Sequence, residues 1–344
     1  MLPAIFGMSG PELTQDEIDL FRAVEPVGYI LFGRNIESRA QVRALTDTLR
    51  ELSGRDNLPI LIDQEGGRVA RLTPPEWLSW PAAERFSRVH CVDPQKARRA
   101  AQANFEALGL ELAEVGVTVN CAPVLDVFQP DGHDVIGDRA FGTDPVVIAD
   151  LGQAVLDGLA AAGVGGVVKH IPGHGRATAD SHHALPQVSA SDEDLKLDLA
   201  PFIALSHAPM AMTAHILYSA WDPKHCATLS ADIIRDIIRE RIGFDGLLMS
   251  DDLDMKALKG TVPELAHAAI EAGCDVALNC WGKIDDMRAI ATRLPEASTD
   301  CRRRLVDAVA NLQLPGEGMN IAERIRELIA ERDTLLSELE QMSA

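Results

Sequence analysis

Three features that are scarce or missing in this sequence limit what the protein can be. Basic residues are outnumbered, with 32 lysines and arginines against 52 aspartates and glutamates, a net charge of −20 at pH 7. Nucleic acids and anionic membranes attract basic surfaces, so this balance argues against both as partners. No apolar run approaches the roughly 20 residues of a membrane-spanning helix, and the opening "MLPAIFGMSG" lacks the basic start of a signal peptide. We therefore expect a cytoplasmic protein.

Cysteine pairs of the kind that bind zinc are also missing. None of the six cysteines belongs to a Cys-x-x-Cys pair, and most lie in apolar runs. This pattern predicts reduced, mostly buried thiols rather than a disulfide framework or a zinc site.

What the sequence does contain is an alternation of short apolar runs with longer helical patterns. Eight runs are strand candidates, because each is short, apolar on both faces and bounded by turn residues. They are residues 2–7, 27–32, 58–63, 117–127, 164–170, 209–216, 246–251 and 274–280. Eight such units predict an α/β fold, a (β/α)8 TIM barrel forming a single domain over residues 1–344. A doubly wound open sheet is the alternative, but no Gly-x-Gly-x-x-Gly follows the first strand candidate.

The helical patterns carry their own start signals. The helix after the first strand candidate opens with a capping box formed by Thr14 and Glu17, and another helix is expected to start near Ser38. From about residue 315 the chain continues as an amphipathic helical tail. We expect this tail to pack on its own chain, with a subunit contact as the other possibility.

Polar side chains recur at the carboxyl ends of the strand candidates. Asp63, Lys169, His170, His215 and Asp251 all lie there. In a barrel these ends converge on one mouth, where barrel active sites are built.

The segment "KHIPGHGRATADSHHALP", residues 169–186, gathers four of the ten histidines. His170, His174, Asp180, His182 and His183 could in principle bind zinc. However, the chain has no His-Glu-x-x-His, and Pro172 and Gly173 prevent a helix from placing His170 and His174 on one face. We therefore expect no metal and no other cofactor.

The same segment offers acid–base chemistry. Asp180 lies two residues before His182, and a carboxylate bonded to an imidazole fixes its tautomer and favours its protonated form. This makes His182 a candidate proton donor near neutral pH. A surface histidine without a role is the other interpretation of so short a pattern.

Two further segments supply a possible nucleophile and possible ligand-binding cations. "MSDDLDM" places Asp251 just past a strand, where a carboxylate can attack a sugar's anomeric carbon. Capping of the next helix is the competing role for the aspartates of this segment. Arg68, Arg71 and Arg139, from "DQEGGRVARL" and "IGDRAFG", could bind an oxygen-rich ligand.

Taken together, the ordered motifs resemble those of family 3 glycoside hydrolases, of the single-domain bacterial β-N-acetylglucosaminidase type. The matching segments are "DQEGGRV", "NCAPVLDV", "IGDRAFG", "KHIPGHG" with "DSHHALP", "MTAHILY" and "MSDDLDM", with weaker matches in "GMSGPELTQDE", "GYILFGRNI" and "AGCDVALNC". They span nearly the whole chain except the C-terminal tail. The departures are mild, such as Ile171 where the family often has Phe.

The resemblance implies a retaining exo-β-N-acetylglucosaminidase, a β-N-acetylhexosaminidase. Asp251 matches the family's nucleophile, His182 its general acid/base and Asp180 the aspartate that assists this histidine. The positions that match sugar-binding residues are Asp63, Arg71, Arg139, Lys169 and His170. The implied substrate is a cell-wall muropeptide fragment, GlcNAc β-1,4-linked to 1,6-anhydro-MurNAc, in peptidoglycan recycling. His174 and His183 match no assigned role.

Two other functions remain open at this point. The first is a phosphorylase, which would form the same covalent intermediate and then transfer the sugar to phosphate. A histidine acid/base is compatible with this reaction, because it does not repel incoming phosphate as a carboxylate would. A non-catalytic sugar-binding protein could share the barrel, although it would have no need of Asp180, His182 and Asp251 together.

Overall fold

The computed structural model describes residues 1–344 except 131–133, 178–184, 311, 313–318 and 344. Within that part of the chain, eight parallel strands follow one another around a sheet in the order β10-β1-β2-β3-β4-β5-β7-β9. The strands are β1 (Leu2–Gly7), β2 (Pro26–Leu31), β3 (Ile60–Ile62), β4 (Val119–Asn120), β5 (Gly165–Ile171), β7 (Met210–Thr213), β9 (Leu247–Met249) and β10 (Ala277–Asn279). Each lies within one of the eight predicted runs or overlaps it.

The sheet closes on itself. A parallel bridge joins Met249, at the end of β9, to Val276, just before β10, and the Ser250 amide donates to the Val276 carbonyl at 3.0 Å. The fold is therefore the predicted (β/α)8 barrel, and the doubly wound alternative is wrong. A separate parallel pair, β6 (Gln187–Val188) and β8 (Leu217–Tyr218), lies outside the barrel.

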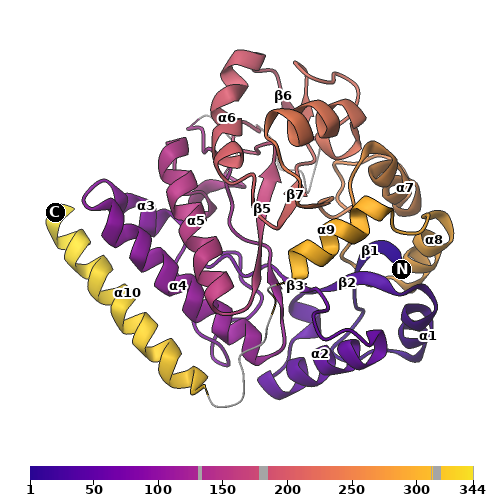
Figure 1. The fold of residues 1–344 in the computed structure, drawn as a ribbon, viewed down its shortest axis with the longest axis horizontal. Helices are drawn as coiled ribbons and strands as arrows, with labels where there is room; N and C mark the ends of the chain where they lie inside the picture. Colours follow the sequence, from indigo (N-terminus) through magenta and orange to yellow (C-terminus); the bar gives the residue numbers. More distant parts are fainter. Residues whose placement is uncertain (131–133, 178–184, 311, 313–318, 344) are drawn as a thin grey trace.

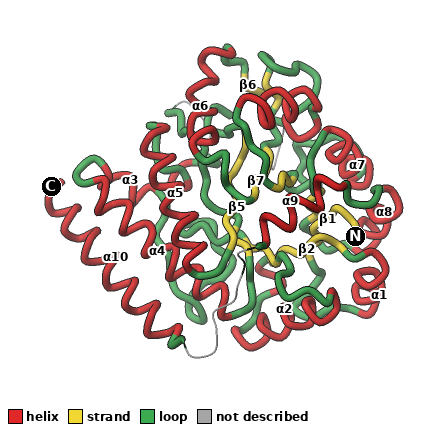
Figure 2. Tube along the Cα trace, in the orientation of Figure 1, coloured by secondary structure: helices red, strands yellow, loops and turns green. Residues whose placement is uncertain are grey.

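Helices surround the strands, as Figure 2 shows. They are α1 (Gln15–Val24), α2 (Arg39–Ser53), α3 (Glu84–His90), α4 (Pro94–Glu114), α5 (Pro145–Ala161), α6 (Asp192–Ala204), α7 (Val262–Ala272), α8 (Ile284–Arg293), α9 (Thr299–Val309) and α10 (Ile321–Ser343), with a π-helix, η4 (Ile233–Arg241), after β7. Short 3-10 turns are η1 (Gly33–Asn35), η2 (Gly137–Arg139) and η3 (Ala227–Leu229). The predicted capping box of α1 is present, and Ser38 caps α2.

Alternation along the strands divides the core into two shells. Side chains such as Ile5, Leu61 and Val167 belong to a cluster inside the barrel, whereas their neighbours Phe6 and Ile62 pack outward against the helices. This is the arrangement expected of strands that are buried on both faces.

Helix α9 closes the amino-terminal end of the barrel. Its residues Cys301, Leu305 and Val309 join the inner cluster, and Figure 1 shows the helix lying across the centre of the ring. The barrel is thus a packed core with a floor, and the opposite end remains as the mouth.

The C-terminal helix α10 packs on its own chain, as predicted. It runs alongside α4 and α3 (Figure 1), and buries Leu328, Leu336 and Leu339. A bidentate ion pair from Arg99 to Glu331, at 2.6 and 2.7 Å, fastens it to α4.

The predictions about thiols and membranes can also be compared with the structure. All six cysteines are unpaired and only Cys91 is exposed, which confirms the prediction that most of the thiols are buried. No helix in the described part of the chain is both long enough and apolar enough to cross a membrane.

Candidate active site

A cavity of about 300 Å³ opens at the mouth of the barrel. Six of the predicted site residues line it together: Asp63, Arg71, Arg139, Lys169, His170 and Asp251. They come from β5, from η2 and from the segments that follow β3 and β9. The convergence of strand ends therefore brings together the described members of the predicted site. Asp180 and His182, as well as His183, lie outside the described residues.

Lys169 and Asp63 form the centre of the site. The Lys169 side chain is only 2% exposed, and its Nζ lies 2.9 Å from Asp63 Oδ1, while Arg71 Nη2 lies 3.1 Å from Asp63 Oδ2. Burial alone would raise the pKa of Asp63, but the two cations outweigh it and hold that pKa below its ordinary value. Burial would likewise lower the pKa of Lys169, but Asp63 and Glu65 raise it. Both groups therefore stay charged at neutral pH.

Glu65 is a second buried carboxylate in the site, and it is not among the predicted site residues. Its Oε1 lies 2.7 Å from Lys169 Nζ, and Arg139 donates to both of its oxygens at 2.8 Å. Burial would raise the pKa of Glu65, but Arg139 and Lys169 hold it well below its usual range. The charges thus continue from Arg71 through Asp63, Lys169 and Glu65 to Arg139, and we call these five residues the mouth network.

The glycine pair after Glu65 explains how this carboxylate reaches the network. Gly66 and Gly67 have φ values of +92° and +55°, and a Cβ on Gly66 would come within 2.3 Å of the Pro81 carbonyl oxygen. Only glycine fits such a left-handed turn without strain. The signal for Glu65 was therefore present in "DQEGG": a carboxylate two residues past a strand-end aspartate, just before an obligatory turn.

His170 is oriented by Asp126, the other functional candidate that sequence reasoning missed. His170 Nδ1 lies 2.7 Å from Asp126 Oδ2, and the His170 and His174 amides both donate to Oδ1, at 3.1 and 2.6 Å. Burial would raise the pKa of Asp126, but His170 lowers it. A fully buried carboxylate that makes these contacts fixes the direction of the His170 ring. The available signal was one charged residue inside the apolar stretch "NCAPVLDV".

Asp251 also lines the cavity, from the segment that follows β9. Its Oδ1 accepts from the Asp252 amide at 2.7 Å, while the preceding Ser250 is buried and its hydroxyl accepts from the Leu278 amide at 2.9 Å. Asp252 accepts from the amides of Asp254 and Cys280, both at 3.2 Å. Burial raises the pKa of Asp252 to about 6, although these amides oppose the shift.

The helix-capping alternative for these aspartates is wrong. The next helix, α7, begins at Val262 and is capped by Thr261. Asp252 instead ties its loop to the end of β10, and Asp254 pairs with Lys283 at 3.2 Å. These contacts fix the segment after β9 to the segment after β10, and Asp251 on the fixed segment lines the cavity.

Three other residues that the sequence singled out, His215, Arg68 and His174, differ in their position relative to the cavity. His215 is buried, with Nδ1 2.7 Å from the Thr228 hydroxyl and Nε2 3.0 Å from the Asp252 carbonyl, so it supports the Asp251 segment from behind. Arg68 lies outside the cavity lining and pairs with Asp138 at 3.0 Å. His174 does line the cavity, and burial together with His170 lowers its pKa to about 4.

The described site suits a ligand rich in hydroxyl groups. Carboxylates that accept and cations that donate alternate along the mouth network, so a polyol can exchange hydrogen bonds with several of them. Asp251 lines the same cavity, whose volume is about 300 Å³. Within the described residues no group of three or more histidines, cysteines or carboxylates is placed to hold a metal ion.

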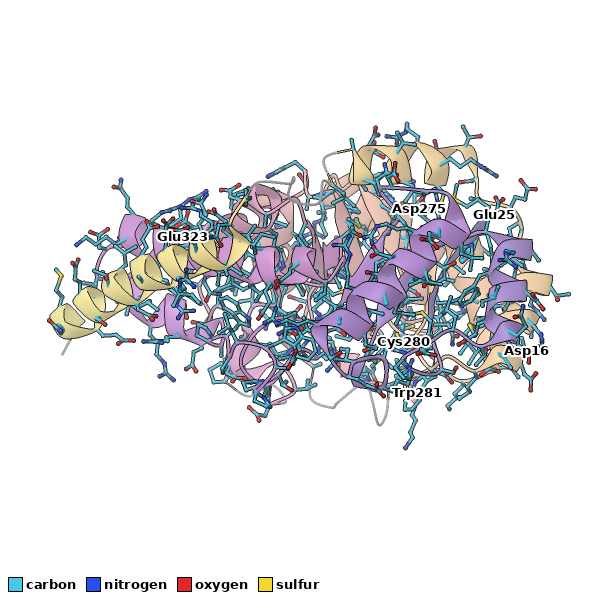
Figure 3. The ribbon with its side chains drawn as sticks, turned by 90° about the horizontal axis from the view of Figure 1, so that it is seen from below. Asp16, Glu25, Asp275, Cys280, Trp281 and Glu323 are labelled. Carbon is cyan, nitrogen blue, oxygen red and sulfur yellow. The ribbon has the colours of Figure 1, made fainter. Side chains whose placement is uncertain are left out.

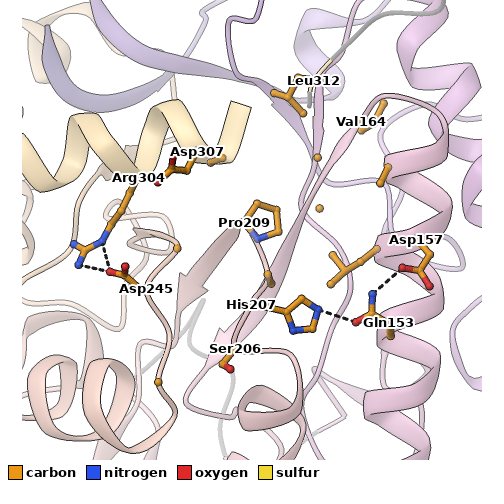
Figure 4. Close-up of a pocket in the computed structure, with 18 of the residues that line it drawn as sticks. Gln153, Asp157, Val164, Ser206, His207, Pro209, Asp245, Arg304, Asp307 and Leu312 are labelled. Carbon is orange, nitrogen blue, oxygen red and sulfur yellow. Dashed lines mark hydrogen bonds and ion pairs between the residues drawn. The ribbon is translucent and has the colours of Figure 1, made fainter. Parts of the chain in front are cut away.

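A second and larger cavity, of about 690 Å³, lies at the amino-terminal end of the barrel. It is bounded by α5, by α9 and by the segments that precede β5, β7 and β9 (Figure 4). Its charged residues are paired along the edge, as in the contacts of Arg303 and Arg304 with Asp245 at 3.0 and 2.8 Å. Barrel enzymes carry their chemistry at the opposite end, so we place the candidate active site at the mouth.

The chain is similar to known proteins in both sequence and structure. The sequence matches the model of the glycosyl hydrolase family 3 N-terminal domain over residues 14–324. The β-hexosaminidase of Alkalilimnicola ehrlichii is 38% identical over 309 residues, which cover 88% of this chain and 87% of that protein. The β-hexosaminidase of Bordetella avium is 38% identical over 315 residues, covering 90% and 89%. The crystal structure of NagZ from Neisseria gonorrhoeae in complex with N-trifluoroacetyl-D-glucosamine is 30% identical, with a TM-score of 0.85 and 97% of each chain covered.

Proposed function

The chain belongs to glycoside hydrolase family 3 as a β-hexosaminidase, and from that premise we propose a retaining exo-β-N-acetylglucosaminidase. Its proposed substrate is a muropeptide fragment, GlcNAc β-1,4-linked to 1,6-anhydro-MurNAc, in peptidoglycan recycling in the cytoplasm. The observation that carries this proposal is the position of Asp251, which lines the same cavity as the mouth network.

In the first step, Asp251 attacks the anomeric carbon of the bound GlcNAc. A bond forms between a carboxylate oxygen and this carbon while the glycosidic bond breaks, and the leaving oxygen takes a proton from His182. Asp180 would hold His182 in the productive tautomer and favour its charged form. The roles of His182 and Asp180 rest on the sequence motif.

In the second step, water attacks the same carbon and returns its proton to His182. Asp251 leaves as a carboxylate, and two inversions give net retention of the β configuration. Neither step calls for a metal or an organic cofactor.

The mouth network and His170 would hold the sugar. Asp63 and Lys169 offer an acceptor and a donor in the cavity lining, to which Arg71, Arg139 and His170 also belong. Ion-paired, preorganised groups lose little freedom when hydroxyl groups bind to them, which favours precise orientation of the ring.

The test is hydrolysis of p-nitrophenyl β-GlcNAc and of GlcNAc-1,6-anhydro-MurNAc, with p-nitrophenyl β-glucoside for comparison. Asp251→Asn should lower kcat by at least about a thousandfold, the scale on which loss of a catalytic nucleophile is felt. The matched control is Asp254→Asn in the same loop, outside the cavity lining, which should keep activity near that of the wild type. Undiminished turnover by Asp251→Asn would refute the assignment.

Product analysis separates hydrolase from phosphorylase. In phosphate buffer a hydrolase releases free GlcNAc, whereas a phosphorylase forms GlcNAc-1-phosphate and slows when phosphate is withdrawn. Binding of the disaccharide by folded protein without turnover would support a non-catalytic sugar-binding protein instead.

A further inference from the structure

Trp281 is an exposed aromatic side chain beside the cavity. It follows β10 and Cys280, which lines the cavity, and it is 56% exposed. Among the large hydrophobic side chains exposed in the described residues, it is the one aromatic. Figure 3 places it at the edge of the molecule next to Cys280, on the side opposite Asp275, which precedes β10.

The indole is held in place although it is exposed. Its Nε1–H donates to Asp252 Oδ2 at 3.1 Å, which ties the ring to the residue that follows Asp251. The Lys283 ammonium lies 5.7 Å from the ring centroid, and Asp254 holds Lys283 at 3.2 Å. Both contacts link the segment after β10 to the segment after β9, so the ring has a defined position at the rim.

A purely structural tryptophan in this protein looks different. Trp80 also donates its Nε1–H to a carboxylate, Glu111 Oε2 at 2.9 Å, but it is only 4% exposed and packs in the core. Burial of the ring is the main stabilising contribution of an aromatic side chain. The exposed ring of Trp281 gains little stabilisation from burial, although its Nε1–H is held by a hydrogen bond to Asp252.

The cavity is large enough for only one of the two sugar rings of a disaccharide. With a volume of about 300 Å³ and several charged groups in its lining, it suits a single sugar ring, the one cleaved from the substrate. The leaving-group sugar of a disaccharide must then lie outside, at the mouth. A flat apolar surface is complementary to the C–H face of a pyranose, and indole provides the largest such surface among the side chains.

We propose that Trp281 is the platform on which the leaving-group sugar stacks, and that it determines preference for a disaccharide over a substrate without a second ring. This inference rests on the proposed glycosidase function and deepens it. Because Asp252 orients both the ring and the neighbouring Asp251 segment, the platform is positioned relative to the group proposed to attack the sugar.

The experiment compares two substrates in three proteins. The substrates are GlcNAc-1,6-anhydro-MurNAc and N-acetyl-β-glucosaminyl fluoride, which has no leaving-group sugar. The proteins are the wild type, Trp281→Ala and Trp281→Phe, with kcat/KM as the readout and the unfolding midpoint as a folding check. Trp281→Ala should lower kcat/KM for the disaccharide by about tenfold, the size expected for one lost aromatic contact, and leave the fluoride within about twofold.

Trp281→Phe separates stacking from positioning. It keeps a flat ring but loses the Nε1–H bond to Asp252, so it should retain disaccharide cleavage within about threefold of the wild type. Equal losses on both substrates, a Phe variant as impaired as the Ala variant, or no change in either variant would each overturn the platform. If the wild type cleaved neither substrate, the proposed function itself would fail, whereas an active wild type with unaffected variants would refute only the platform.

Discussion

The two ends of the barrel hold cavities that differ in size and in how their charges are arranged. The mouth cavity is the smaller, about 300 Å³ against about 690 Å³, yet its central cation, Lys169, is 2% exposed. At the amino-terminal end, Arg303 is 46% exposed and pairs with an exposed Asp245. Exposed ion pairs contribute little to folding stability. Buried charges carry a desolvation cost, so a cluster of them indicates a functional role. Buried charge, more than cavity volume, therefore marks the candidate site.

The largest effect on stability should come from removing the central cation of the mouth. Lys169→Met leaves Asp63 and Glu65 buried without the ammonium that lies between them, so the free energy of unfolding should fall by about 3 kcal/mol. Hydrolysis of the aryl β-GlcNAc should also fall by at least about a hundredfold, since a hydrogen-bonding group proposed to contact the sugar is lost. Urea denaturation at pH 7 and steady-state kinetics measure the two effects.

The matched control is Lys283→Met, the same substitution at the exposed rim. Its stability should change by less than about 1 kcal/mol, as for most exposed ion pairs. If Lys169→Met were no more destabilising than this control, the mouth network would not depend on its buried cation as we describe.

An intermediate effect should appear on acidification. The pKa values of Asp63, Glu65 and Asp126 are all depressed in the folded state, whereas free carboxyl groups titrate near pH 4. Their stabilising contribution is therefore complete above about pH 5 and is lost as pH falls towards the folded-state values. The free energy of unfolding should decline below pH 5, and Glu65→Gln should make that decline shallower.

Asp245→Asn provides the comparison from the other end of the barrel. A hydrogen bond from Arg304 also lowers the pKa of Asp245, but solvent screens this exposed carboxylate, so its loss should change the acid slope much less. Equal slopes for Glu65→Gln and Asp245→Asn would remove the distinction between the two ends.

The smallest effect should follow substitution at the amino-terminal cavity. Arg303→Met removes an exposed cation, so stability should change by less than about 1 kcal/mol and kcat/KM should stay within about twofold of the wild type. A marked loss of activity would show that the two cavities are coupled, contrary to the independence expected of opposite ends of a packed barrel.

The fold could be predicted from sequence because its pattern is local and repeated. Each strand of the barrel lies within or overlaps a predicted apolar run, and the end of each strand predicted where Asp63, Lys169 and Asp251 would meet. Start signals such as Thr14 and Ser38 depend on residues three positions away, so they too could be read directly.

The partners that complete the site could not be predicted in the same way. Asp126 contacts His170, and Glu65 contacts Arg139, only after distant strands have been brought together. The capping role expected for the Asp251 segment failed for a related reason, since Asp252 bonds to the end of β10 rather than to its own downstream helix. Contacts between strand ends depend on the closed barrel, which no short stretch of sequence encodes.

During synthesis, the first strand leaves the ribosome long before one of its two partners exists. β1 (Leu2–Gly7) lies between β2 and β10 (Ala277–Asn279), and α9, which fills the floor, is made later still. A nascent chain that stops short of β10 must therefore hold an incomplete ring with an unpaired edge on β1. Ring closure is then a late event relative to the synthesis of the other seven strands, and the incomplete ring is the species most exposed to misassembly.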